Sequence, residues 1–575
     1  MITELANHLK PSSTFLPCPP ASDRNAWDSI PADYRKRLIK EGEKYLNFPF
    51  PSILMTDFME FSRTGNRVHF EDKQFARRTI LNALVLAECA EYEGRFLDDI
   101  INALFLICEE TAWQLPAHNN YIKDTPQFLL PDVTRPVVDL FAAETGAVVA
   151  VAEYVLRDAL AAVSPTVSTV VNHNLTIRVF EPYLTEHFWW MGDGKTAVNN
   201  WTSWCTQNLL LAVFTREPGW MPDFASIRCR DAEEWQSLVF RKACKSLDYF
   251  LEEYGEDGCC DEGAQYYRHA GLCLFGCLEI LNGITDHAFS FAWEQEKIRN
   301  IASYILNVHV DTIYYVNFAD CSPVAGRCNA REYLFGKRTG NQALMEFAAS
   351  DYQNSEDPLT LDEHNLFYRL QTVFSHEEMM QYDRNPVIVH RDLYYESVGL
   401  FMARDSRLYL AVKGGDNDDS HNHNDVGSFT IYKDGKPLCI DAGVETYTKQ
   451  TFSPDRYDIW TMQSRYHNLP TFVDHGRETV QQAGEQYRAA DVRYELGETA
   501  CRISMDLRQA YPDDRIRSYS RQAMLEKEKS ITIRDHYEGD GGTAILSLMF
   551  CEKPVIDQNT IRIGDLAACT VEGAS

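Results

Sequence analysis

The chain has 575 residues, of which 45% are hydrophobic and 24% are charged, and its formal net charge at pH 7 is −29. This length exceeds what one hydrophobic core supports, so we expect at least two domains. The negative charge argues against a nucleic-acid binder, which usually carries a basic surface. It does not exclude a polyanionic substrate, because a groove can be locally basic on an acidic protein.

The sequence has no stretch of about 20 apolar residues, so no membrane span is expected. The N-terminus, MITELANHLKPSSTF, lacks the basic and apolar regions of a secretory signal. The 16 cysteines are scattered through helical segments, which is typical of reduced, buried thiols. These features favour the cytoplasm, whereas a chain from which a signal had been removed would be periplasmic or secreted.

From about residue 23 to residue 374 the hydrophobic pattern has the period of helices. Helical blocks are expected at 138–163, 202–214, 232–254, 264–283 and 294–308. The loops between them are rich in Pro, Gly, Asn and Asp. Many antiparallel helices in one domain predict a helical toroid or an α-solenoid over residues 1–375.

After about residue 386 the chain alternates apolar and polar residues, as in LYYESVGLFMARDSRLYLAVKGG. GSFTIYKDGKPLCIDAG predicts a β-hairpin with Asp434 and Gly435 at its turn. We therefore expect an antiparallel β-sheet domain over residues 386–575, built as a sandwich of facing sheets that could continue beyond the end of the chain. The predicted fold class is α+β, multidomain.

The stretch SHNHNDVGSF concentrates imidazoles in an acidic chain and suggests a metal site. His421 and His423 are one residue apart, and residues i and i+2 of a strand point to the same side. Asp441 follows in IDAG at the end of the next strand, and His467 follows in SRYHN. His423, Asp441 and His467 would form a His₂–Asp set that suits Zn²⁺ or another borderline cation. The alternative is two surface loops whose histidines bond the backbone.

Two polar stretches in the helical part are candidates for proton-transfer chemistry. AVNNWTSWCTQN carries Asn200 and Trp201 before an amphipathic helix. GEDGCCDEGAQYYRHAGLCLFG carries further polar side chains at a helix start: Glu262, Tyr266, Tyr267, Arg268 and His269. Each has an ordinary structural alternative, since Asn200 could cap a helix, Tyr266 could be a core tyrosine and Glu262 could be a first-turn acid.

The motifs NNW, DEGAQYY, SHNHNDVGSF, IDAG and SRYHN occur in this order, and they are specific only as a set. They resemble the heparinase II/III family of polysaccharide lyases, which also includes alginate lyases of related architecture. The resemblance covers the motifs from about 180 to 475 and the order of the two domains. It implies an incomplete (α/α) toroid followed by antiparallel β-sheets. It also implies a carbon–oxygen lyase that cleaves uronic-acid-containing polysaccharides by β-elimination and leaves an unsaturated uronate end.

The resemblance implies catalytic roles for individual residues. Asn200 looks like the asparagine that neutralises the substrate carboxylate, and His421 looks like the catalytic histidine. Tyr266 looks like the catalytic tyrosine, with the register between Tyr266 and Tyr267 left open. Some members have a histidine directly after the asparagine pair, where this chain has Trp201. That departure places more of the proton transfer on His421 and the tyrosine.

The resemblance also implies a metal and substrate contacts. His423, Asp441 and His467 look like the ligands of one divalent ion, usually zinc in this family, with manganese as an alternative; we expect the ion to be structural. The expected substrate-binding side chains lie near the catalytic motifs: Trp201, Tyr267, Arg268 and Arg465. The alternative for Arg465 is a surface ion pair.

The chemistry explains these residue types. β-Elimination removes the C5 proton α to a carboxylate, whose charge must first be neutralised or hydrogen-bonded. An amide donates without titrating, a neutral imidazole can accept a proton near pH 7, and tyrosine suits the leaving oxygen. A cation such as Arg268 could instead lower the tyrosine pKa and make it the base. His421 and Tyr266 are therefore predicted as the acid/base pair, in either direction.

Other functions stay open at this point. A glycosaminoglycan is the expected substrate, and alginate or its oligosaccharides are the alternative with the same mechanism. A glycoside hydrolase would need two carboxylates about 5–10 Å apart, which the adjacent Asp261 and Glu262 cannot supply by themselves. A metal-dependent hydrolase and a non-catalytic carbohydrate-binding protein are further alternatives. The expected partner is an acidic polysaccharide or oligosaccharide, with no nucleic acid or membrane; homo-oligomers stay open.

Overall fold

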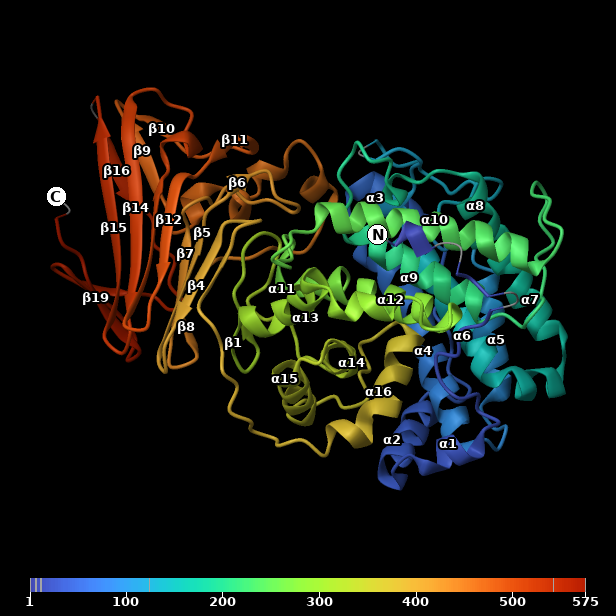
Figure 1. Ribbon diagram of the computed structural model, residues 1–575. Coiled ribbons are helices and arrows are strands. Elements are labelled where there is room, and N and C mark those ends of the chain that lie inside the picture. Colours follow the sequence, from blue (N-terminus) through green and yellow to red (C-terminus); the bar gives the residue numbers. More distant parts are fainter. Residues whose placement is uncertain (1, 6–7, 11–12, 124, 541, 574–575) are drawn as a thin grey trace. The chain divides into compact units, whose positions relative to one another are not determined.

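The computed structural model describes residues 2–5, 8–10, 13–123, 125–540 and 542–573 (Figure 1). The chain divides into two compact units. Unit 1 comprises Met1–Tyr254, His269–Ile298 and Cys328–Pro386, and unit 2 comprises Gly255–Arg268, Arg299–Arg327 and Val387–Ser575. Two segments from the helical part of the sequence therefore belong to unit 2. The domain limits 1–375 and 386–575 stay a prediction.

Unit 1 is helical, and its helices pack both on their neighbours in the sequence and on helices further along the chain. The helices that lie wholly within it are α1 (Arg24–Ser29), α2 (Ala32–Glu43), α3 (Met55–Thr64), α4 (Val68–Glu91), α5 (Leu97–Cys108), α6 (Leu140–Val163), α7 (Thr166–Leu175), α8 (Glu181–Thr185), α9 (Asn200–Phe214), α10 (Ala232–Glu253), α12 (Gly271–Ile284), α14 (Ala330–Thr339), α15 (Gln342–Gln353) and α16 (Leu366–Met379). Helix α4 packs on α2 and α6, α6 packs on α9, and α9 packs on α10 and α12. The late helix α16 returns to α6, as a toroidal arrangement requires.

The helix starts show why the expected blocks form where they do. Asp139 caps α6, since its Oδ1 accepts a hydrogen bond from the Ala142 backbone N–H at 2.7 Å. The block expected at 264–283 is two helices, because α11 (Gly263–Tyr267) ends before α12 begins at Gly271. Helix α11 belongs to unit 2 and α12 to unit 1, so the chain passes between units at this break.

Helix α6 carries two buried glutamates in opposite electrostatic environments. Burial raises the pKa of Glu144 to about 8, while its Oε2 accepts a hydrogen bond from Trp204 Nε1 at 2.7 Å. Burial also opposes the charge of Glu153, but the nearby Arg216 guanidinium outweighs it and the pKa is lowered. Arg216 Nη1 lies 2.9 Å from Glu153 Oε2.

Replacing Glu144 with glutamine is expected to raise Tm at pH 8 and to leave it unchanged near pH 4. The pKa of Glu144 is raised from an ordinary 4.5 to about 8, so the folded protein holds this proton more tightly than the unfolded chain does. The stability that this proton contributes is fully present below pH 4.5 and is lost as the pH rises to about 8. Glutamine has no proton to lose, and in a chain of 575 residues each kcal/mol of stability regained raises Tm by about 1 °C. The matched control, Glu153→Gln, is expected to lower Tm at pH 8, by an amount that shrinks in acid. Thermal unfolding at several pH values measures both; a Glu144→Gln gain that does not grow with pH contradicts the prediction.

Unit 2 contains two larger antiparallel sheets. The first has the order β3 (Leu393–Tyr395), β4 (Leu400–Arg404), β5 (Leu408–Lys413), β7 (Phe429–Lys433) and β8 (Lys436–Cys439). The second has the order β12 (Ala490–Leu496), β13 (Ala500–Asp506), β14 (Ile516–Glu526) and β15 (Ser530–Gly539). Phe401 and Leu410 of the first sheet share one buried core with Ile503 and Ala523 of the second. The predicted α+β class, a toroid followed by a β-sandwich, is confirmed.

Smaller sheets and two helices complete unit 2. The remaining strands are β1 (His309–Asp311), β2 (Tyr314–Tyr315), β6 (Asp416–Asn417), β9 (Pro470–Asp474), β10 (Arg477–Thr479), β11 (Gly484–Arg488), β16 (Thr543–Leu546), β17 (Val555–Asp557), β18 (Thr560–Ile563) and β19 (Ala567–Thr570). Most of α13 (Glu296–Val308) also lies in unit 2. Asp434 and Gly435 join β7 to β8 with φ of 51° and 74°, so the predicted hairpin turn is confirmed.

All 16 cysteines lie in the described part of the chain and are free thiols. Thirteen of them are buried and Cys229, Cys551 and Cys569 are half-buried, which agrees with the expected absence of a disulfide framework. Among the described residues, no helix combines the length and the apolarity needed to cross a membrane.

Candidate active site

The histidine motif lies in the connection between β6 and β7, so the prediction that His421 and His423 sit on a strand is wrong. His421 has a φ of 59°, the left-handed conformation that is uncommon for a residue with a side chain. Long-range hydrogen bonds hold the connection in place. The Asn424 backbone N–H donates to the Met462 carbonyl at 3.0 Å, and Gln481 Nε2 donates to the Val426 carbonyl at 2.7 Å.

Tyr266 lies against His421 within unit 2. The two rings are stacked, with their centroids 4.8 Å apart and an interplanar angle of 20°. The Tyr266 hydroxyl donates a hydrogen bond to the Tyr447 hydroxyl at 2.7 Å, and His421 Nε2 lies 3.4 Å from Glu262 Oε2. The two residues that were predicted as an acid/base pair are therefore direct neighbours.

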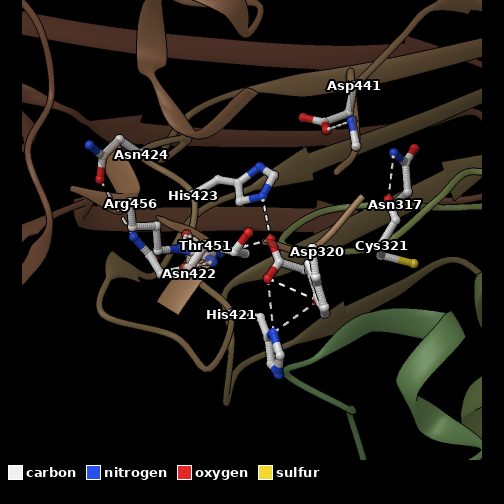
Figure 2. A network of polar contacts seen from close by, with 12 residues as sticks. Asn317, Asp320, Cys321, His421, Asn422, His423, Asn424, Asp441, Thr451 and Arg456 are labelled. Carbon is white, nitrogen blue, oxygen red and sulfur yellow. Dashed lines mark hydrogen bonds and ion pairs between the residues drawn. The ribbon is translucent and has the colours of Figure 1, made fainter. Parts of the chain in front are cut away.

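Asp320, in the segment after β2, lies at the centre of the polar network in Figure 2. Its Oδ2 accepts from His421 Nδ1 at 2.9 Å and from the Tyr447 hydroxyl at 3.1 Å. Its Oδ1 accepts from His423 Nε2 at 3.0 Å and from Arg456 Nη2 at 2.7 Å. The Asp320 side chain is fully buried, so this carboxylate depends on its four donors.

These contacts shift the pKa values of the network. Burial would raise the pKa of Asp320, but the hydrogen bonds from His421 and His423 outweigh it and hold the pKa far below its usual range. Burial would lower the pKa of His421, but the hydrogen bonds to Asp320 and Glu262 raise it to about 9. Burial raises the pKa of Tyr447 far above that of a free tyrosine. The network therefore holds a buried negative charge surrounded by donors.

A second buried cluster could hold a metal ion. Asp425, Asp441 and His467 each offer one possible ligand atom, and these three atoms lie within 4.8 Å of one another. Two of the three predicted ligands, Asp441 and His467, are in this group, and Asp425 is an addition. The predicted third ligand, His423, has its ring centroid 5.6 Å from that of His467.

The donor atoms of this cluster fit a cation. His423 Nδ1, His467 Nε2 and Asp425 Oδ2 are buried and have no hydrogen-bond partner among the described residues. Buried polar atoms without partners are costly, and a metal ion would satisfy them. Asp441 Oδ2 lies 2.7 Å from His467 Nδ1, an ion pair that outweighs burial, lowering the pKa of Asp441 and raising that of His467.

Replacing His467 with alanine is expected to abolish metal binding, because it removes one of the buried donor atoms. His475→Ala is the matched control, since that imidazole is 96% exposed and lies outside the cluster. Elemental analysis of the dialysed proteins gives the metal content. Chelation should also lower Tm of the wild type, and metal at 100 times its Kd should restore about 2.7 kcal/mol. Equal metal content in both variants would rule out this cluster.

Asn200 and Trp201 belong to unit 1. Asn199, not Asn200, caps α9, because its side chain accepts a hydrogen bond from the Trp201 backbone N–H at 3.1 Å. Asn200 is the first helical residue and is 3% exposed. The Trp201 ring lies in an aromatic cluster, 4.6 Å from His118 and 5.0 Å from Trp189 between centroids. The capping role considered for Asn200 is thus filled by its neighbour.

The other predicted substrate contacts have structural partners within unit 2. Tyr267 is a core residue, and its hydroxyl donates to the Ala302 carbonyl at 3.3 Å. Arg268 Nη2 donates to the Arg327 carbonyl at 2.5 Å. Arg465 forms an ion pair with Glu478 at 3.0 Å, with both side chains partly exposed, which is the alternative considered for it.

Sequence reasoning missed Asp320, Asp425, Tyr447 and Arg456. Asp425 lies inside the quoted histidine motif, so its carboxylate could have been added to the metal set. Asp320 stands in NFADCSP, between residues that are buried, and a lone acid in such a setting signals a buried partner. The sequence does not identify the partner of Asp320. Tyr447 and Arg456 lie in a loop whose sequence gives no comparable indication.

The comparisons with known proteins agree with this architecture. No protein of curated function matches the chain. The chain is similar to a solved structure of heparinase III, with a TM-score of 0.55 and 14% sequence identity; the similarity covers 97% of this chain and 79% of the other. It is also similar to the structure of the heparan sulfate lyase HepC from Pedobacter heparinus, with a TM-score of 0.52 and 12% sequence identity; this similarity covers 97% of this chain and 77% of the other. The chain therefore has the toroid-plus-β-sheet fold of these proteins.

The C-terminal part of the chain adds a match at the level of sequence. Residues 390–559 match the family model described as Heparinase II/III-like, C-terminal. Over these residues the chain is similar to the heparinase II/III-like family, which confirms the resemblance expected from the motifs SHNHNDVGSF, IDAG and SRYHN.

Proposed function

We propose that the protein is a polysaccharide lyase that cleaves a uronic-acid-containing polysaccharide or oligosaccharide by β-elimination. A glycosaminoglycan is the first substrate class to test, because the structures of similar fold include a heparan sulfate lyase. The observation that carries the proposal is the stack of the Tyr266 and His421 rings, whose centroids lie 4.8 Å apart; of the two residues, His421 lies in the part of the chain that the family model matches. It brings two proton-transfer groups to one place.

In this mechanism one of the pair removes the C5 proton and the other protonates the oxygen on C4, as the C4–O bond breaks and a double bond forms between C4 and C5. Asn200 donates a hydrogen bond from its amide N–H to the substrate carboxylate. This bond lets negative charge spread onto the carboxylate during removal of the C5 proton. The burial of Tyr267 and its bond to the Ala302 carbonyl support Tyr266 as the tyrosine involved. Each turnover conserves protons, since one leaves carbon and one joins oxygen.

The metal cluster supports a structural role for a divalent ion, zinc first and manganese second. His423, Asp425, Asp441 and His467 would hold it, and none of them needs to touch the sugar. A bound ion would balance the negative charges of Asp425 and Asp441. It would also hold in place the connection between β6 and β7 that carries His421. Nitrogen and carboxylate donors together suit zinc.

Asp320, one of the carboxylates near His421, does not favour a glycoside hydrolase. Both oxygens of Asp320 already accept two donors each, so this residue is not placed to protonate or attack a glycosidic bond. Alginate remains a substrate candidate, because it presents the same carboxylate and C5 proton.

The test is a panel of heparan sulfate, chondroitin, hyaluronan and alginate, with ultraviolet absorbance recorded for new double bonds. The proposal predicts that absorbance rises in step with chain cleavage on at least one polymer. New reducing ends without absorbance would show hydrolysis. Binding without cleavage on every polymer would show a carbohydrate-binding protein.

A further inference from the structure

We propose that Asp320 is a positioning residue that orients the rings of both His421 and His423 and fixes the tautomer of His423, and so links the metal cluster to the proton-transfer imidazole. The role of His421 in proton transfer rests on the proposed function. The Asp320 side chain comes from the segment after β2, 101 residues before His421 and 103 before His423 in the sequence. It reaches both rings at once, one with each carboxylate oxygen (Figure 2).

A carboxylate can only accept hydrogen bonds, so each ring nitrogen that faces Asp320 must carry a hydrogen. His423 then has its hydrogen on Nε2, and its Nδ1 keeps a lone pair for a metal. His421 has its hydrogen on Nδ1, and its Nε2 faces Glu262 at 3.4 Å. In metal sites, a partner of this kind orients the ligand ring and sets its tautomer.

The groups around Asp320 keep the carboxylate charged and in place. Arg456 donates to Asp320 Oδ1 at 2.7 Å and also to the carbonyl of Asn422, the residue between the two histidines, at 3.0 Å. The Arg456 side chain is 12% exposed, so the pair is well shielded from water. The hydrogen bond from Arg456 to the Asn422 carbonyl ties the backbone of the histidine motif to the guanidinium that also binds Asp320. Asp320 and Arg456 thus hold both rings and the peptide between them.

The test is Asp320→Asn, which keeps the shape of the side chain but replaces one acceptor oxygen with an NH₂ group. That group meets a ring N–H, so at least one histidine must turn or change tautomer. Metal affinity is expected to fall about 10–100-fold, and kcat on the polymer that the wild type cleaves is expected to fall by a similar factor. KM should stay within about threefold, because Asp320 is buried and does not reach substrate.

The matched control is Asp535→Asn, which removes the carboxylate partner of another buried arginine in the same unit. Arg521 Nε lies 2.7 Å from Asp535 Oδ1, and its side chain is fully buried. This variant should lower thermal stability, because it leaves the buried Arg521 guanidinium without its carboxylate, and yet keep the wild-type metal affinity and kcat. Equal losses of metal affinity in both variants would reduce Asp320 to a general structural role and overturn the proposal.

A measurement on the unmodified protein covers the case in which Asp320→Asn does not fold. Histidine labelled with ¹⁵N reports by NMR which ring nitrogen carries hydrogen, with signals assigned through His421→Gln and His423→Gln. The proposal expects hydrogen on Nε2 of His423 and on Nδ1 of His421 in the zinc-loaded protein. Absence of hydrogen from either of these two nitrogens overturns it. If no polymer is cleaved, the proposed function fails, while tautomers and metal affinity still decide the role of Asp320.

Discussion

Replacing Tyr266 with phenylalanine is expected to lower kcat of the elimination by about 10²–10⁴-fold, the usual contribution of a positioned acid or base. Phenylalanine keeps the ring that stacks on His421, so the fold of the site should persist. Only the hydroxyl is lost, together with its 2.7 Å hydrogen bond to Tyr447. Initial rates from ultraviolet absorbance, measured over a range of polymer concentrations, give kcat and KM separately.

Tyr267→Phe is the matched control, since it removes a hydroxyl from the next residue. That hydroxyl donates to the Ala302 carbonyl inside the core, so its loss should cost about 0.5–1.5 kcal/mol of stability. Its kcat should stay within a few-fold of the wild type. If Tyr267→Phe is the inactive variant and Tyr266→Phe is active, the catalytic register is one residue later than proposed.

Asn200→Asp is the second substitution with a large expected effect. An amide that donates to the substrate carboxylate becomes a second negative charge, which repels the group it should stabilise. Loss of one such donor typically lowers kcat by about 10²–10³-fold, and here repulsion should raise KM as well. The same kinetic assay measures kcat and KM of this variant.

The neighbouring residue supplies the control for Asn200. Asn199→Ala removes the side-chain cap of α9, which should cost about 0.5–2 kcal/mol of stability. Its effect on kcat should be small, because the cap hydrogen bond goes to the backbone of Trp201. An active Asn200→Asp variant beside an inactive Asn199→Ala variant would mean that helix position, and not the Asn200 amide, matters for turnover.

The fold could be predicted because its signals are local. The helical period of 138–163 reappears as α6, with Asp139 as its cap, and the Asp434–Gly435 pair reappears as a hairpin turn. Turn chemistry and hydrophobic periodicity act over a few residues and need no partner elsewhere. The errors fall where tertiary contacts decide, as in the connection that carries His421, which was expected to be a strand.

The site could be predicted only in part for the same reason. His421, Tyr266, Asp441 and His467 stand in motifs that are recognisable as a set. Asp320 acquires its role only when the segment after β2 meets the connection before β7, and no periodicity connects these segments. The motifs therefore give no sign of the carboxylate that reaches His421 from a distant segment.

The division of the chain has a practical consequence for anyone who wishes to dissect it. The polypeptide crosses between the two units at five places, after Tyr254, Arg268, Ile298, Arg327 and Pro386. A fragment that starts at Val387 would carry both histidines yet omit Glu262, Tyr266 and Asp320, so its loops would lack their anchors. Separate expression of an amino-terminal and a carboxyl-terminal half should yield two misfolded products, and folding of unit 2 must await synthesis of nearly the whole polypeptide.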